Sequence, residues 1–175
     1  MALTDLAFLA SATRDLDQAR AYFEESLAIF EACGWANSGP SGASAHGLAQ
    51  VAREQHRKDE AHRLDHHALG IDLRNGYVGH AAGCLLALAD FAMERGDPAL
   101  AARLFGATDR VLGPARCRGL LETGLDEPSR EAFQRLAEAL TGLLGEDALE
   151  REVAVGRALS DTELLDLTAP KVPPG

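Results

Sequence analysis

Apolar residues recur along the chain at the three- and four-residue intervals that are typical of amphipathic α-helices. Near the start, Leu3, Leu6, Ala7 and Ala10 follow this spacing, and similar stripes continue through most of the sequence. A helix with this pattern buries one face and leaves the other in water. Helices are predicted over about residues 16–32, 77–95, 98–112, 126–144 and 146–159, and around Leu48 and Leu64 in more polar segments.

Helix boundaries are marked by residues that stop or start a helix. Gly96 can adopt the left-handed conformation that ends a helix, Asp97 can cap the next one, and Pro98 suits its first turn. Ser160 and Glu163 have the spacing of a capping box, which predicts a short final helix. Loops are predicted over residues 33–42 and 113–125, and residues 169–175 have the composition of a linker or tail.

The predicted helices fall into three pairs that can be aligned with one another. Each first helix carries a Leu–Ala dipeptide, at Leu6–Ala7, Leu48–Ala49 and Leu88–Ala89. Each second helix carries an alanine, and a large or polar residue follows four positions later; these positions are Ala19 and Phe23, Ala61 and Asp65, and Ala101 and Phe105. Small residues let two helices approach closely, and a single pair cannot bury both its faces, so the pairs must stack.

The alignment resembles the tetratricopeptide repeat. In that family a Leu–small dipeptide in the first helix packs with a small residue and an aromatic in the second. The resemblance implies an all-α, right-handed stack of antiparallel helix pairs. A single domain is expected over residues 1–168, followed by the tail, and its expected parts are units over about 1–34, 41–76 and 77–113 and a C-terminal cap over about 126–168.

Three features depart from the family pattern. The units repeat every 40 to 42 residues rather than every 34 or so. Asp65 stands where the other two pairs carry Phe23 and Phe105, and the aromatic that the family places near the start of the first helix is absent. The middle pair is therefore the least regular of the three.

The C-terminal half also resembles the last helical repeats of large actinobacterial regulators of the LuxR and AfsR types. The similar segments run from Gly96 to Ala107 and from Gly156 to Ser160. Such regulators join an ATPase module to a helical-repeat sensor and often to a helix-turn-helix. This chain has no phosphate-binding loop motif and no basic recognition helix after its Pro-rich end. We therefore expect the sensor-type repeat region alone, either as a fragment or as a stand-alone relative.

Composition and charge narrow the possible partners. The 32 alanines and 27 leucines far outnumber the six valines and two isoleucines, which favours helices over strands. A net charge of −10 disfavours binding to nucleic acid and to anionic membranes. No secretory signal or membrane span is visible, and Cys33, Cys84 and Cys117 lack paired spacing, so a cytoplasmic location is expected.

Four histidines cluster in the middle pair, at His56, His62, His66 and His67. On a helix, His62 and His66 would share one face with Asp59, which allows a metal-binding sensor or enzyme as an alternative function. Nearby arginines oppose cation binding, so a solvated helix face is the favoured interpretation, with a histidine-based pH response as a further possibility. No group of residues supports catalysis, and neither an enzyme activity nor a cofactor is expected.

Binding by shape is the remaining mechanism. The family resemblance implies that certain first-helix positions line a concave face that receives a protein or peptide partner. These positions are Thr4, Phe8 and Ser11 in the first unit, His46, Gln50 and Arg53 in the second, and Leu86, Asp90, Met93 and Glu94 in the third. The preferred role is a non-catalytic interaction or sensing module of a bacterial transcriptional regulator. A stand-alone adaptor is the alternative, and a homodimer through the N-terminal end is left open.

Overall fold

The computed structural model describes residues 3–113 and 127–170, and these residues form nine α-helices and no strand. The chain divides into two compact units with a boundary between His80 and Ala81. The first unit contains α1 (Leu3–Ala12), α2 (Leu16–Ala32), α3 (Gly39–Glu54) and α4 (Lys58–Asn75). At the boundary begins α5 (Val78–Glu94), and the second unit continues with α6 (Pro98–Leu112), α8 (Glu127–Leu144), α9 (Glu146–Ala158) and α10 (Asp161–Thr168). The expected all-α repeat architecture is confirmed.

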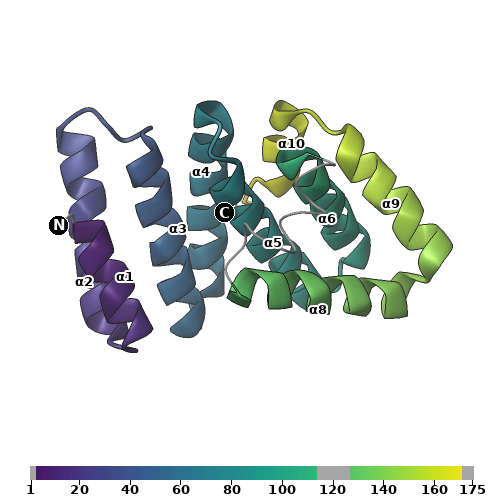
Figure 1. Ribbon diagram of the computed structural model, residues 1–175, viewed down its shortest axis with the longest axis horizontal. Coiled ribbons are helices and arrows are strands. Elements are labelled where there is room, and N and C mark those ends of the chain that lie inside the picture. The colour runs from purple at the N-terminus through teal and green to yellow at the C-terminus, as the bar shows by residue number, and fades with distance from the viewer. Residues whose placement is uncertain (1–2, 114–126, 171–175) are drawn as a thin grey trace, which may run out of the picture. The chain divides into compact units, whose positions relative to one another are not determined.

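In the first unit, each helix packs against the next, and α1 also contacts α3 (Figure 1). The core joins small residues such as Ala7 and Ala19 to the ring of Phe23, which has no exposed surface. Gly47 of α3 lies directly over that ring, because a Cβ atom added there would come within 2.3 Å of Phe23. Small side chains therefore set the distance between helices, as the alignment predicted.

The turns inside the helix pairs have one geometry at three places along the chain. Arg14, His56 and Gly96 each adopt a left-handed conformation, with φ of 65°, 61° and 75°. The following residue in each turn donates its backbone N–H to a carbonyl five residues earlier, at Ala10, Ala52 and Ala92. This is the Schellman ending of a helix. The turns are spaced by 42 and 40 residues, so they repeat at the predicted intervals.

In the second unit, α6 and α9 cross at closely opposed backbones. A Cβ atom on Gly106 would lie 2.2 Å from the Val153 carbonyl oxygen, and one on Gly156 would lie 1.9 Å from that of Arg103. Each helix thus places a glycine against a backbone carbonyl of the other helix. Arg103 pairs with Glu152 beside this crossing, and α6 also packs Phe105 against Phe133 of α8, with ring centroids 4.4 Å apart.

The boundaries of several elements agree with the sequence predictions. Asp97 accepts a hydrogen bond from the Leu100 N–H at 2.9 Å, so the predicted cap is confirmed. Ser160 and Glu163 form the reciprocal bonds of a capping box, with the Ser160 N–H donating to Glu163 at 2.8 Å. The repeated alanines Ala19, Ala61 and Ala101 are all buried.

One predicted loop was too long. The loop over residues 33–42 ends earlier than expected, because α3 begins at Gly39 with Ser38 as its N-cap and Pro40 in its first turn. The side chain of Ser38 accepts from the Ser41 N–H at 3.4 Å. The glycines and serines of this segment therefore start a helix rather than prolong a loop. Most of the predicted loop over 113–125 and of the predicted tail lies outside the described residues.

No helix in the described part of the chain has the length and the apolar character needed to cross a membrane.

The expected single domain over residues 1–168 stays a prediction.

Candidate binding face

Three predicted partner-binding residues of α3 lie along one side of the helix and are joined into a network. His46, Gln50 and Arg53 are separated by four and three positions, which places them on successive turns. The His46 Nδ1 atom lies 2.8 Å from Asp65 Oδ1, and Arg53 forms an ion pair with Asp65 Oδ2. The Nε2 atoms of Gln50 and His46 are 3.2 Å apart. We call Gln50, His46, Arg53 and Asp65 the α3 polar network.

The tautomer of His46 follows from its two neighbours. A carboxylate can only accept, so His46 Nδ1 carries the proton and donates it to Asp65. The Nε2 atom then accepts from the Gln50 amide, which is exposed. Asp65 thereby fixes the orientation of the imidazole and of the guanidinium of Arg53. The network presents ordered hydrogen-bonding groups at the surface of α3 rather than freely rotating side chains.

The carboxylate of Asp65 is buried, with only 2 % of its side chain exposed. Asp65 occupies the position that Phe23 holds in the first pair, where the ring fills the gap between helices. A buried carboxylate needs a partner charge and hydrogen bonds, and Arg53 and His46 supply them from the facing helix. The departure from the family pattern at this position is therefore compensated by two of the predicted partner-binding residues.

The three predicted residues of α1 have different environments. The hydroxyl of Thr4 lies 3.0 Å from those of Ser26 and Ser44, which are themselves 3.1 Å apart, so Thr4 links α1 to α2 and α3. Phe8 is 41 % exposed and meets the Phe23 ring edge-on, with centroids 5.1 Å apart. Ser11 is half-buried. Of the three, Phe8 offers the largest apolar surface to a partner.

The remaining predicted residues lie on α5, in the second unit. Leu86 is buried, Met93 is half-buried, and Asp90 and Glu94 are exposed. We refer to the residues of α1 and α3 in the predicted set as the α1/α3 face: Thr4, Phe8, Ser11, His46, Gln50 and Arg53. Only its α3 members are joined by side-chain contacts described above.

The alternative metal site is not assembled by the fold. In the described part of the chain, the ligand atoms of Asp59, His62 and His66 do not gather closely enough to hold an ion together. Asp59 is exposed in the first turn of α4, whereas His62 and His66 are half-buried. Burial lowers the pKa of His66, and the nearby His62 and His67 lower it further. Asp59, His62 and His66 all lie on α4, but their ligand atoms do not come together around one metal position.

Ion pairs, some of them partly buried, lie near the turns of the first unit. Arg20 of α2 forms hydrogen bonds with Glu60 of α4 at 3.0 and 3.3 Å and with Glu24 at 2.9 Å. These bonds raise the pKa of Arg20, and the bond to Arg20 lowers the pKa of Glu60 despite its partial burial. Arg14 likewise pairs with Glu54 of α3. These contacts tie the helices together at the end of the pairs where the turns lie.

Sequence reasoning missed two functional features of the middle pair. It treated Asp65 only as a missing aromatic, although His46 and Arg53, seven positions apart, carried the signal for a buried counter-charge. It also gave no role to Asp72, which is completely buried. A carboxylate in a polar helix looks like a surface residue in the sequence, so burial could be recognised only from the packing.

A family model for the tetratricopeptide repeat matches residues 1–74. These residues form a tetratricopeptide-like repeat region. The match covers α1 to α4 almost completely, so it includes the irregular middle pair with Asp65. No curated protein and no solved structure matches the chain. Tetratricopeptide repeats generally serve protein–protein interaction.

Proposed function

We propose that the chain is a non-catalytic module that binds a protein or peptide partner through the α1/α3 face. The observation that carries the proposal is the α3 polar network, in which buried Asp65 holds His46 and Arg53 in fixed positions. Ordered donors and acceptors lower the entropic cost of binding. Phe8 adds an exposed aromatic surface on α1, at the position that Gln50 holds in α3.

The polar and apolar members of the face suit a partner in the form of a helix or an extended peptide. Leu86, Asp90, Met93 and Glu94 of α5 belong to the proposed binding set by the same alignment. We propose no direct contact with nucleic acid, because the net charge of −10 repels phosphate.

A displayed library of random peptides, selected against the whole chain, tests the face directly. Selected peptides should bind Phe8→Ala and Gln50→Ala at least about tenfold more weakly than the unaltered protein, since each change removes an exposed contact. Lys58→Ala and Arg63→Ala, which alter exposed residues of α4, serve as matched controls and should bind normally. Circular dichroism confirms that each variant is folded. Equal binding by the face variants and the controls would contradict the proposal.

We further propose that this module belongs to, or is related to, a bacterial transcriptional regulator and works in the cytoplasm. The resemblance of the segments Gly96 to Ala107 and Gly156 to Ser160 to such regulators supports this assignment. A stand-alone adaptor is the rival function. Reading the coding sequence on both sides of this segment separates the two. A phosphate-binding loop upstream or a helix-turn-helix downstream favours the regulator, and the absence of both favours the adaptor.

A further inference from the structure

Asp72 lies in the last part of α4, at the place where that helix crosses the start of α3. Its side chain has no exposed surface. The Oδ1 atom lies so close to Gly42 that a Cβ atom there would come within 2.6 Å of it. The carboxyl therefore fills space between α3 and α4 in a region where it is shielded from water.

The segment that leaves α4 folds back over the same place. Gly76 has a left-handed conformation, with φ of 73°, and the Tyr77 N–H donates to the Asp72 carbonyl at 2.9 Å. The Tyr77 ring covers Gly39, where a Cβ atom would lie 2.2 Å from the ring. His80 stacks on Tyr77 with ring centroids 6.2 Å apart. The connection from α4 to α5 is thus fastened to the first turn of α3.

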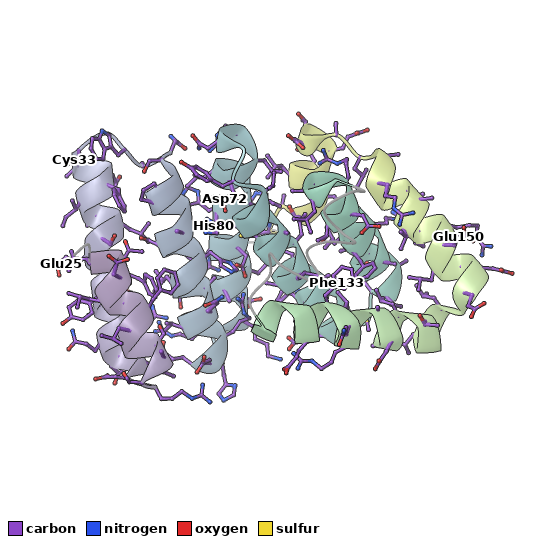
Figure 2. All side chains as sticks on the ribbon, in the orientation of Figure 1. Glu25, Cys33, Asp72, His80, Phe133 and Glu150 are labelled. Atoms are coloured by element: carbon purple, nitrogen blue, oxygen red, sulfur yellow. The ribbon has the colours of Figure 1, made fainter. Side chains whose placement is uncertain are left out.

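His80 brings a second titratable group to this crossing. Its Nδ1 atom lies 4.0 Å from Asp72 Oδ1, and Figure 2 shows the two labelled residues close together where α4 ends and α5 begins. From α3, His46 is the titratable group that acts on both Asp72 and His80 through its charge when it is protonated. On α4 itself, Asp65 lies two turns earlier, and its charge is matched by Arg53.

Burial dominates the ionisation of both groups. Burial raises the pKa of Asp72 to about 7, and the charge of His46 opposes that rise. Burial also lowers the pKa of His80, as does His46. Each group therefore favours its neutral form in the folded chain: the Asp72 side chain has no exposed surface, and that of His80 is only partly withdrawn from water.

We propose that Asp72 and His80 form a proton-operated latch that holds the α4–α5 connection on the first turn of α3. The latch consists of Asp72, His80, Tyr77 and the glycines Gly39 and Gly42 that receive them. It is closed while Asp72 carries its proton and loosens when the carboxyl ionises between the two helices. The repeat region thereby gains a response to pH at the start of α3. The Arg14–Glu54 ion pair lies at the other end of that helix.

The direction of the pH effect follows from the raised pKa of Asp72. The folded chain holds this proton more tightly than the unfolded chain, so stability falls as the pH rises toward about 7 and becomes flat above it. His80 acts in the opposite direction, because its lowered pKa removes stability as the pH falls. Asp72→Asn cannot ionise, so the difference between the unaltered chain and this variant isolates the contribution of Asp72.

Two measurements on the whole chain test the latch. In urea unfolding, the folding equilibrium constant of the unaltered chain relative to Asp72→Asn should fall about tenfold between pH 6 and pH 8. The control Asp59→Asn, which changes an exposed carboxyl on the same helix, should retain the pH dependence. In carbon-detected NMR, the Asp72 carboxyl should titrate near pH 7.

The expected local effect is faster amide hydrogen exchange of residues 39–44 at pH 8 in the unaltered chain than in Asp72→Asn, after correction for the intrinsic rate. An Asp72 carboxyl that titrates below pH 5 would overturn the proposal. So would an Asp72→Asn variant with the same pH dependence of unfolding as the unaltered chain. Both readouts depend on a folded protein, and the NMR titration needs no substitution at all.

Discussion

Single residues in this protein show how strongly the role of a side chain depends on its position in the repeat. Arg14, His56 and Gly96 occupy the same left-handed position of three equivalent turns, but only Gly96 is suited to it. A side chain in this conformation costs about 1–2 kcal/mol through the contact of Cβ with the following carbonyl. The first two turns therefore form in spite of their sequences, held by the packing of the helices on either side.

This strain gives a first prediction. His56→Gly should raise the free energy of unfolding by about 1 kcal/mol, because glycine adopts φ of 61° without steric cost. His56 is exposed, so no buried contact is lost. The control His67→Gly places glycine at an exposed position inside α4 and should lower stability by about 1 kcal/mol. Urea unfolding of both variants measures the effects, and a His56→Gly variant less stable than the unaltered chain would show that the turn is not strained.

The buried Asp65 gives a second prediction at the same scale. Arg53→Leu should destabilise the protein by about 3 kcal/mol, because it leaves a buried carboxylate without its counter-charge. The double variant Arg53→Leu with Asp65→Leu should recover most of that loss, since an apolar pair can replace a buried ion pair at little cost. A double-mutant cycle by urea unfolding gives the coupling. Additive losses would mean that the two side chains act independently.

At the scale of helices, capping residues and close crossings decide where elements begin and how near they lie. The spacing of apolar residues predicted α2 and α6 with their observed bounds because Asp15 and Asp97 cap them and the flanking turns are short. The start of α3 was placed too late, since its first turn is rich in glycine and serine, which usually indicate a loop. In this protein those residues are small because the helix packs tightly against its neighbours.

The crossing of α6 and α9 gives a third prediction. Gly106→Ala and Gly156→Ala should each destabilise the protein by about 2–3 kcal/mol or more, because the added methyl group meets a rigid backbone carbonyl. Gly142→Ala is the matched control, since this glycine lies inside α8 with open space around it. That variant should be stabilised by up to about 1 kcal/mol through better helix propensity. If all three variants melted alike, the close crossing would be disproved.

The repeated alanines allow a fourth prediction. Ala101→Leu should overpack the buried face of α6 and destabilise the protein by about 1–3 kcal/mol. The exposed Ala139 of α8 provides the comparison, and Ala139→Leu should be nearly neutral. Thermal unfolding followed by circular dichroism is sufficient. An Ala101→Leu variant that melts with the unaltered chain would remove the basis for aligning the third pair with the first two.

At the scale of the whole molecule, the chain divides into two compact units. The alignment of three helix pairs predicted the repeat region, because periodic spacing and small residues are visible in the sequence. The division at His80 was not predicted, since no run of glycine, proline or serine marks it. The candidate face was only partly predictable: the sequence selected His46 and Arg53, but the buried carboxyl that orders them could be recognised only from the packing of α4 against α3.

The division into two units gives a fifth prediction. Stability in repeat proteins is a sum of local contributions, so a change in one unit should act mainly there. Gly106→Ala should therefore speed native-state amide exchange in α6 and α9 more than in α2 and α3. Exchange measured by mass spectrometry at the peptide level resolves these segments. A uniform increase across both units would show that they open together.

The common turn of the first two helix pairs has a consequence for how such a chain can change length. Trp35 and Tyr77 stand one full period apart, and the backbone hydrogen bonds at Ala10 and Ala52 recur at that same interval of 42 residues. A duplicated segment of this length would begin and end at matching points of the hairpin. A repeat protein of this kind can therefore lengthen by whole helix pairs and keep the same turns between them. Each added pair would extend the row of first-helix side chains that a partner can contact.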